Sequence, residues 1–431
     1  MTLVHFTIDI PVQSNISFIG NKNGTVFDYK HDKRGRLIFN YSTNKGETVK
    51  MENIIFENFN SFGITFTEIL LVFATSDNFY FIINNCTFRN NENRIFRSEI
   101  TCEERSHSEP SIVFNNCNFY NNTQGIIGVS NESSIFDDNR DECSTIDIKN
   151  SIFINNAAII YSHHSHVEID NCYFSRIENY SLNNKNIVFY SSRNIFSNLI
   201  IKNSIFKYIN TQCSLPLIDG ENIKLEIFNT SFSNCYTSYG YLIDIRHTKN
   251  LCTLFHGDDN IYEIDNSYFY DIKLSNSIPI LSDSRFSIFT ITNTKFSNIT
   301  SLFGEQSQYT IKNVQLNSIY INSKAILYFI YNNVVIDNLE VEDIKCVGDD
   351  DKSSFLLFDS GEDKKSLNIN KLSIKNGVSN GGFIKINGYS NKLVISNSFI
   401  NNIKSSGSII ESKSKNVKIN TNNNTNNIKL L

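Results

Sequence analysis

The chain has 431 residues, of which 40% are hydrophobic, and its formal net charge is −5. It contains no block of basic residues, which argues against nucleic acid or an anionic membrane as its main partner. No apolar run approaches the roughly 18 residues of a membrane-spanning helix, and the first residues lack the basic and apolar regions of a secretion signal. We therefore expect no transmembrane segment and no signal peptide in this chain.

The first 48 residues contain short runs in which apolar and polar residues alternate, and this period of two is typical of strands. We expect strands over 5–12, 16–19, 25–29 and 37–41. These runs lack the repeat that follows, so residues 1–48 are expected to form an irregular first coil.

A short phrase recurs from residue 49 to about residue 420, most compactly at 146–153 and 167–174. Each copy has apolar residues two and four places before an Asn, a small residue one place after it and an aromatic residue three places after it. Alternate side chains of a strand point to opposite faces, so these four positions share one face only if the phase slips at the Asn. Asn is the non-glycine residue best tolerated in the left-handed backbone region. The phrase therefore predicts two short strands that meet at an Asn corner.

The corners recur with a minimal spacing of about 20 residues, and repeats of this length are typical of solenoids. We number positions from the corner, so that +3 is the aromatic residue. The predicted corners are Asn53, Asn85, Asn116, Asn150, Asn171, Asn203, Asn229, Asn266, Asn293, Asn313, Asn338, Lys371, Asn397 and, weakly, Thr421.

A third apolar patch follows most copies of the phrase, as at 158–160 and 382–384. Three strands per repeat, each turned relative to the last, wind into a coil, and parallel crossover connections are strongly right-handed. The sequence therefore predicts an all-β protein, a single-stranded right-handed parallel β-helix of roughly 13 coils. The array is expected to fill residues 49–420, and the Asn- and Thr-rich tail 421–431 is expected to be disordered.

Stacked coils would place equivalent residues above one another. The +3 position would form an aromatic column in the core, made of Phe88, Phe119, Phe153, Phe174, Phe206, Phe232, Phe269 and Phe296. The corner amides Asn85, Asn116, Asn150, Asn171, Asn203, Asn229, Asn266 and Asn293 would form a side-chain ladder.

Seven of the nine cysteines fall into two groups. Cys86, Cys117 and Cys172 occupy the inward +1 position, where a small buried thiol is expected. Cys102, Cys143, Cys213 and Cys252 lie in loop insertions, and Cys102 with Cys143 and Cys213 with Cys252 are candidate disulfides for an oxidising compartment. The sequence does not fix their connectivity. Zinc is not expected, because no Cys-x-x-Cys pair occurs.

The repeats resemble right-handed parallel β-helix proteins of the pectin-lyase-like fold. The phrase Phe-Ile-Asn-Asn at 153–156 and Gly-Gly-Phe-Ile at 381–384 are similar to repeats of chlamydial polymorphic outer-membrane adhesins. The opening 16–25 resembles the first coil of large extracellular β-helix proteins of anaerobic gut fungi. The resemblance implies an extracellular or cell-surface location. The chain departs from the adhesins in lacking a C-terminal membrane barrel, and most of its copies have Asn two rather than three places after Phe.

Pectin-active enzymes of this fold use charged residues on the outward side of one strand stack. The outward candidates here are Asp147, Glu168, Asp170, Glu226, Glu263 and Asp265. Neighbouring coils would hold Asp147 and Glu168 at about one strand spacing, close to the roughly 5 Å that separates the carboxyl groups of a retaining glycosidase. The motifs Asn-Thr-Asp, Gly-His-Gly and Arg-x-Pro-x-x-Arg of such enzymes are absent. A solvated face, whose charges pair with interleaved lysines, is therefore the favoured interpretation.

Two further clusters are candidate metal sites. His164 and His166 would share one strand face, an arrangement that suits a transition metal. Residues 349–351 with Glu362 and Asp363 supply carboxylates that suit calcium. Neither cluster has the ligand spacing of an established site, so polar loops are favoured and no metal or cofactor is expected.

The sequence favours a non-catalytic extracellular or cell-surface scaffold for adhesion or glycan binding, with polysaccharides or surface proteins as partners. One alternative is a polysaccharide lyase or glycoside hydrolase that acts on a pectin-like substrate through the outward carboxylates. Another is an ectodomain fragment of a larger membrane protein. These functional interpretations depend on analogy at the level of the fold.

Overall fold

The computed structural model describes residues 7–32, 34–43, 45–60, 68–101, 109–132, 144–162, 165–178, 189–191, 197–211, 217–221, 223–237, 242–246, 261–274, 286–299, 307–322, 324–348, 353–388, 391–414, 416–421 and 428–430. Its regular elements in these ranges are all strands. The chain divides into two compact units, Met1–Lys224 (unit 1) and Leu225–Leu431 (unit 2).

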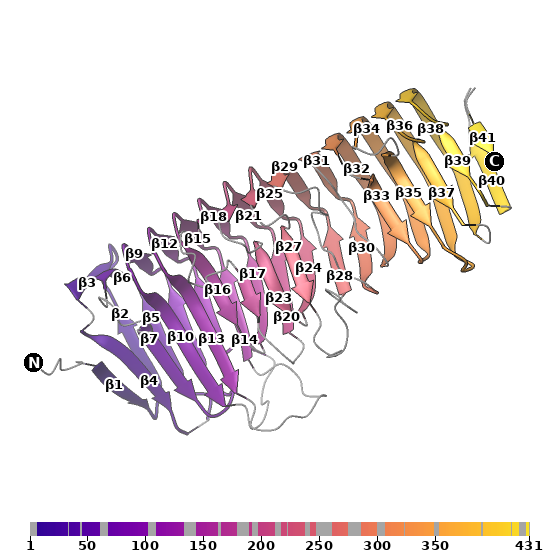
Figure 1. The fold of residues 1–431 in the computed structure, drawn as a ribbon. Coiled ribbons are helices and arrows are strands. Elements are labelled where there is room, and N and C mark those ends of the chain that lie inside the picture. Colours follow the sequence, from indigo (N-terminus) through magenta and orange to yellow (C-terminus); the bar gives the residue numbers. More distant parts are fainter. Residues whose placement is uncertain are drawn as a thin grey trace, which may run out of the picture. The chain divides into compact units, whose positions relative to one another are not determined.

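Unit 1 contains three stacks of parallel strands, and successive arrows of each stack point the same way (Figure 1). The first stack contains β2 (Ile16–Ile19), β5 (Thr48–Glu52), β8 (Tyr80–Asn84), β11 (Ile112–Asn115), β14 (Ser144–Lys149), β17 (Ser165–Asp170) and β20 (Ser197–Lys202). The second contains β3 (Thr25–Asp32), β6 (Ile54–Phe59), β9 (Thr87–Arg89), β12 (Asn118–Tyr120), β15 (Ile152–Ile154), β18 (Tyr173–Ser175), β21 (Ile205–Lys207) and β22 (Asn210–Thr211). The third contains β1 (Thr7–Val12), β4 (Arg36–Tyr41), β7 (Glu68–Ala74), β10 (Arg94–Thr101), β13 (Gly125–Glu132), β16 (Ala158–Ser162), β19 (Phe189–Ser191) and β23 (Ile218–Glu221).

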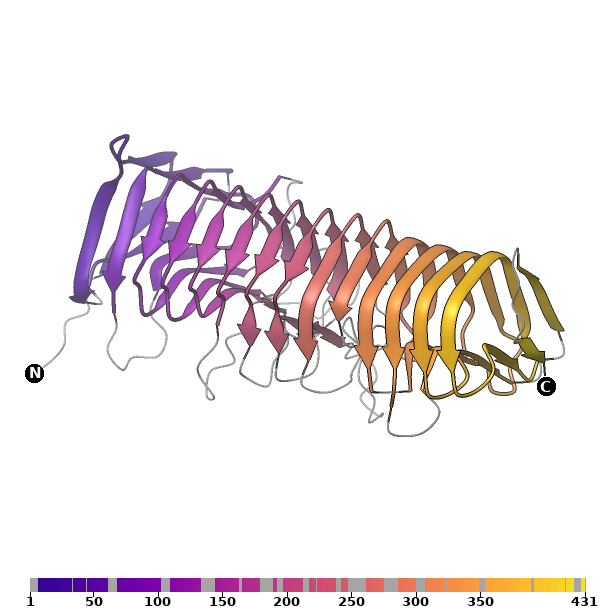
Figure 2. The ribbon, with the colours of Figure 1, turned by 90° about the horizontal axis from the view of Figure 1, so that it is seen from above.

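Unit 2 repeats the pattern, but its later coils join the first and second strands into one long bent strand. The separate strands are β24 (Ile223–Phe228), β28 (Ile261–Asp265) and β30 (Ile288–Thr292), followed by β25 (Ser231–Ser233), β26 (Tyr236–Thr237), β29 (Tyr268–Leu274) and β31 (Lys295–Ile299). The long strands, orange to yellow in Figure 2, are β32 (Gln308–Ile321), β34 (Val334–Cys346), β36 (Ser366–Ser379) and β38 (Lys392–Ser405), with β40 (Asn416–Thr421) at the end. The third strands of the unit 2 coils are β27 (Ile243–Arg246), β33 (Ala325–Ile330), β35 (Ser354–Asp359), β37 (Ile384–Asn387), β39 (Ile410–Ser412) and β41 (Ile428–Leu430).

The predicted phase slip occurs at the corners. Asn150 has a φ of 52°, and the inward positions Ile148, Ser151 and Phe153 on either side of it are all buried. A positive φ recurs at all the other predicted corners from Asn53 to Asn397, including Lys371. A single left-handed residue reverses the inward–outward alternation, and short strands therefore present apolar residues to the core on both sides of each corner.

The core of each unit contains a column of aromatic rings at the +3 position. In unit 1 the ring centroids of Phe119 and Phe153 are 4.4 Å apart and those of Phe153 and Phe174 are 4.6 Å apart, with nearly parallel planes. In unit 2 the rings of Phe269 and Phe296 are 4.9 Å apart. These distances match the spacing of paired strands, so in-register stacking of the coils produces the ring contacts.

The all-β parallel solenoid expected from the sequence is confirmed, and the number of turns differs only slightly from thirteen. The four strands expected in the first 48 residues are present as β1, β2, β3 and β4. Within the tail 421–431, for which we expected disorder, Ile428–Leu430 forms β41 and pairs with β39. In the described part of the chain, no helix is long and apolar enough to cross a membrane. The direction of winding stays a prediction.

Candidate functional site

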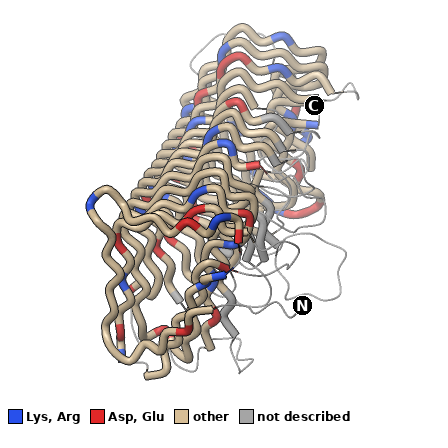
Figure 3. Tube along the Cα trace, turned by 90° about the vertical axis from the view of Figure 1, so that its left-hand side faces the viewer, with Lys and Arg blue, Asp and Glu red and all other residues tan. Residues whose placement is uncertain are grey.

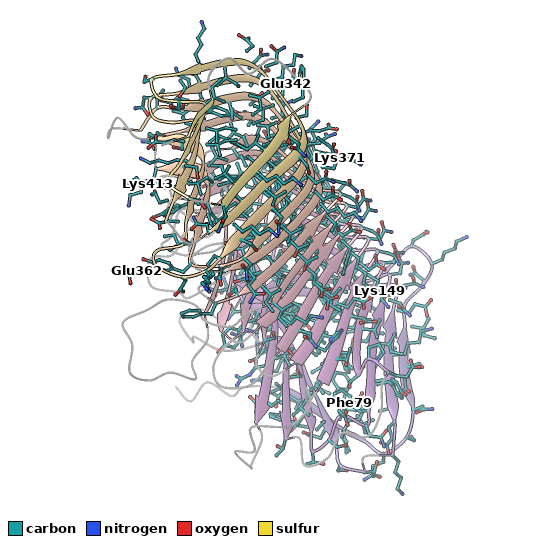
Figure 4. The ribbon with its side chains drawn as sticks, turned by 90° about the vertical axis from the view of Figure 1, so that its right-hand side faces the viewer. Phe79, Lys149, Glu342, Glu362, Lys371 and Lys413 are labelled. Atoms are coloured by element: carbon teal, nitrogen blue, oxygen red, sulfur yellow. The ribbon has the colours of Figure 1, made fainter. Side chains whose placement is uncertain are left out.

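The outward carboxylates of unit 1 lie on β14 and β17 of the first stack. Asp147 pairs in register with Glu168, so the two side chains are direct cross-strand neighbours. Each also binds a lysine: Nζ of Lys149 lies 2.6 Å from Oδ2 of Asp147, and Nζ of Lys202 lies 3.2 Å from Oε2 of Glu168. The hydrogen bond from Lys149 to Asp147 is the main cause that raises the pKa of Lys149. Lys149 lies on the outside of the strands (Figure 4).

Asp170, the third candidate of unit 1, also lies among the charged residues of these strands. Asp170 lies in register between Lys149 of the preceding strand and Lys202 of the following strand. It also accepts a hydrogen bond of 2.7 Å from Nδ2 of Asn203. The carboxylate column is short, because the position of Asp147 is occupied by Val113 one strand earlier and that of Glu168 by Ile200 one strand later. Along the described part of the chain trace, acidic and basic residues are interspersed (Figure 3).

In unit 2 the candidates lie on β24 and β28. Glu226 and Glu263 are cross-strand neighbours, and Asp265 pairs with Phe228 on one side and Thr292 on the other. Asp265 accepts a hydrogen bond from the hydroxyl of Thr292 and a second one, of 2.8 Å, from Nδ2 of Asn293. Asp265 therefore takes part in the corner ladder, where its role is structural.

The metal and disulfide candidates are only partly within the described residues. His166 lies on β17 in register with Thr145 and Asn198, whereas His164 lies outside the described ranges, as do residues 349–351. In the ranges that the structure describes, no three His, Cys, Asp or Glu side chains form a group that could hold a metal ion. Cys102, Cys143, Cys213 and Cys252 also lie outside them. Cys86, Cys117, Cys172 and Cys346 are buried free thiols, and Cys235 is also buried.

The corner residues form a ladder of side-chain amides on the surface. In unit 1, Nδ2 of Asn116 donates to Oδ1 of Asn85 at 3.2 Å, and Nδ2 of Asn171 donates to Oδ1 of Asn150 at 2.7 Å. In unit 2, Asn266 donates to Asn229 at 3.2 Å. The ladder departs from strict stacking at four of the predicted corners: Asn150 donates to Asn115, Asn203 to Asp170, Asn293 to Asp265 and Asn397 to Asn370.

Sequence reasoning missed a second left-handed corner five residues after the first. It occurs in every coil from Asn58 to Asn402 and has its own ladder, in which Nδ2 of Asn155 donates to Oδ1 of Asn121 at 3.1 Å and Nδ2 of Asn402 donates to Oδ1 of Asn376 at 2.6 Å. The signal was the frequent Asn two places after the core Phe. In the sequence alone, this Asn stands out only as a departure from the adhesin pattern.

A buried column of asparagines at position +6 was also missed. Asn91, Asn122 and Asn156 are at most 2% exposed. Nδ2 of Asn91 donates to Oδ1 of Asn122 at 3.0 Å, and Nδ2 of Asn122 donates to Oδ1 of Asn156 at 2.9 Å. The double asparagines at 90–91, 121–122 and 155–156 were the sequence signal for this column.

Sequence reasoning also missed a group of charged residues on strands β4, β7 and β10 of the third stack of unit 1, which we call the arginine cluster. It contains Arg36 of β4, Glu68 of β7, and Arg94, Arg97 and Glu99 of β10. Glu68 is 1% exposed, and its two oxygens lie 3.3 Å from Nη2 of Arg36 and 3.3 Å from Nη1 of Arg97. Nη2 of Arg97 lies 2.6 Å from Oε1 of Glu99. No sequence signal marked this cluster, because the third strands follow the corners at variable distances.

Aromatic side chains also occur on the outward side of the second stack of unit 2. Tyr268 and Tyr270 point outward on β29, their ring centroids are 5.7 Å apart, and Tyr270 is 36% exposed. Nζ of Lys295 lies 5.7 Å from the centroid of the Tyr268 ring. Small residues lie beside them in register, Ser231 and Ser233 on β25. The rings therefore have small side chains beside them on one flank and Lys295 and Ser297 on the other, and outward aromatic rings suit contact with the apolar face of a sugar.

No protein-family model matches the chain, and no curated protein is significantly similar to it in sequence.

Proposed function

We propose that this chain is a non-catalytic scaffold outside the cell or on its surface, where its outward strand faces bind glycans or surface proteins. The parallel solenoid carries the proposal, because every coil presents side chains to solvent at the same positions and at the spacing of paired strands. Such a periodic surface suits a polymer with repeated units. We further propose that the solenoid is of the pectin-lyase-like kind that the repeats resemble.

The ion pairs of the candidate carboxylates support a binding role over a catalytic one. A glycosidase needs one carboxyl group as a proton donor and the other as a nucleophile or base. Here Asp147 and Glu168 are each paired with a lysine at 3.2 Å or less. Both carboxylates are thus already engaged in ion pairs, which fits a charged binding surface better than a catalytic pair.

Binding to immobilised polysaccharides tests the proposal. The full chain should be retained by at least one member of a panel of neutral, carboxylated and sulfated polysaccharides. Replacing both Tyr268 and Tyr270 by Ala should weaken retention, whereas Tyr331→Ala, which removes a tyrosine that is 46% exposed outside β29, should not. Retention by no polysaccharide and by no cell surface would overturn the proposed function.

The catalytic alternative rests on one observation, the cross-strand placement of Asp147 beside Glu168. If these residues act as a catalytic pair, the chain should release products from pectin, and Glu168→Gln should abolish the release. Activity that survives this substitution would exclude the pair.

A further inference from the structure

Arg94 is the one member of the arginine cluster that lacks an ion-pair partner among the described residues. Glu68 lies beside it in register, but the two oxygens of Glu68 contact Arg36 and Arg97. Glu99 is paired with Arg97. Three arginines therefore share two carboxylates, and the surplus positive charge is on Arg94.

The surroundings of Arg94 keep its guanidinium close to the sheet. A Cβ atom placed on Gly128 would lie 3.0 Å from both Cδ and Nη1 of Arg94, so the arginine side chain lies across the glycine of the next strand. Gly128 pairs in register with Tyr161 of β16, which is half-buried. Burial is the largest effect on Arg94 and lowers its pKa. The guanidinium is thus partly desolvated, and the carboxylate that acts on it, Glu68, is already paired with two other arginines, which is an unfavourable state for a charged group.

We propose that Arg94, with Gly128 below it and Tyr161 beside it, forms a binding site for an oxyanion group, a carboxylate or a sulfate. Arginine presents a planar fork of donors that matches such groups. The missing side chain at Gly128 leaves room for the guanidinium itself to lie against the sheet, which fixes the position of its donors. The inference deepens the proposed function and rests on it in one respect, namely that the oxyanion is carried by a glycan.

The test compares binding by the full chain and by matched variants. The probes are inorganic sulfate, glucuronate, alginate, dextran sulfate and neutral dextran, measured by calorimetry. Arg94→Gln removes the charge, and Gly128→Ala keeps the charge but displaces the tip of the arginine. Arg89→Gln is the control, because Arg89 is a surface arginine already paired with Glu57 at 2.5 Å. Circular dichroism and thermal unfolding check that each variant is folded.

We expect Arg94→Gln to weaken binding of the anionic probes by about ten- to a hundredfold, the range for the loss of a charged hydrogen-bonding group. Gly128→Ala should weaken it less, and Arg89→Gln should leave it unchanged. Carboxylated and sulfated probes together identify which oxyanion the site prefers.

Three results would overturn the site: no binding of any anionic probe, equal losses in Arg94→Gln and Arg89→Gln, or full binding by Arg94→Gln. Binding of neutral dextran that is insensitive to Arg94, without anion binding, would overturn the site but support the proposed function. Arg94-dependent binding of sulfate or glucuronate without retention by any glycan or cell surface would support the site and overturn the proposed function.

Discussion

The corner asparagines combine a backbone role with a side-chain role, and substitutions can separate the two. Asn171 has a φ of 53° and donates from Nδ2 to Asn150 at 2.7 Å. In Asn171→Val the β-branched side chain opposes the left-handed conformation, and we expect the free energy of unfolding to fall by about 1–2 kcal/mol or more. Asn171→Gly keeps the backbone and loses the amide, so its loss should be smaller. Urea denaturation measures both.

Thr290→Val is the matched control for this comparison, because Thr290 points outward from the extended strand β30 and valine suits that conformation. We expect its effect to stay within about 0.5 kcal/mol. Equal losses in Asn171→Val and Asn171→Gly would show that backbone strain does not explain the choice of Asn.

Because the thiols are buried, we expect the free energy of unfolding to fall as the pH rises above about 9. Burial, the largest effect, raises the pKa of Cys86 from 9.0 to about 11 and that of Cys172 to about 12. Below pH 9 the thiols are protonated in both states and contribute no pH dependence. Between pH 9 and 11 the unfolded chain releases these protons while the folded chain retains them, so stability falls as pH rises, by about 1.4 kcal/mol per pH unit for each thiol.

Urea denaturation at pH 8 and pH 10.5 measures this effect. Cys86→Ser removes one titrating group, and serine already occupies the equivalent position at Ser151 and Ser204. The variant should show a smaller loss of stability between the two pH values. An unchanged loss would contradict the assignment of Cys86 as a contributor.

The aromatic column predicts a large contrast between two phenylalanines. Phe153 is fully buried between Phe119 and Phe174, whereas Phe399 on β38 is 40% exposed. Phe153→Ala should lower the free energy of unfolding by about 3–5 kcal/mol, because it removes buried area and leaves a cavity. Phe399→Ala should cost less than about 1 kcal/mol. Similar values from denaturation of the two variants would contradict the burial of the column.

At the level of the strand, the buried asparagine column predicts strong coupling between coils. Asn122 accepts from Asn91 and donates to Asn156, so Asn122→Ile leaves buried partners unsatisfied and should cost about 1–3 kcal/mol. Isoleucine already occupies the equivalent position at Ile272 and Ile299. Replacing all three asparagines by Ile should therefore cost clearly less than the sum of the three single losses. Additive losses in a mutant-cycle analysis would show that the amides act independently.

The sequence predicts some of these elements better than others. The first corner was predictable, because an invariant reversal of apolar phase at Asn150 and Asn171 requires a left-handed residue. The second corner was harder, since Tyr208, Ser318 and other residues replace Asn there. The merged strands β32 and β34 were not predictable, because a corner leaves the hydrophobic pattern unchanged whether or not pairing continues through it.

The candidate site was less predictable than the fold for a physical reason. Inward residues are restricted by packing, and their pattern can be read along one repeat. Charged contacts such as those of the buried Glu68 with Arg36 and Arg97 depend on the register of the third stack, and loops of variable length separate these strands. The register was therefore unknown until the coils were placed.

At the scale of the whole molecule, function is not determined by the repeat that determines the fold. The interior columns repeat with few side-chain types, whereas outward positions vary from Asp147 and Glu168 to Ile200 along a single column. Under the proposed function, specificity would come from local combinations on the surface, such as Tyr268 with Tyr270 or the arginine cluster.

The solenoid architecture also predicts how far the effect of a single core substitution extends along the chain. Each coil contacts mainly its neighbours, so stability is close to a sum of local terms. Phe88→Ala in unit 1 should accelerate amide hydrogen exchange mainly in β6, β9 and β12, and Phe269→Ala in unit 2 mainly in β25, β29 and β31, because these strands pair directly with the altered one or contain it. Exchange measured by mass spectrometry on both variants tests this, and each variant is the control for the other. If both variants accelerate exchange equally throughout the chain, the molecule unfolds as one cooperative body and the local description is wrong.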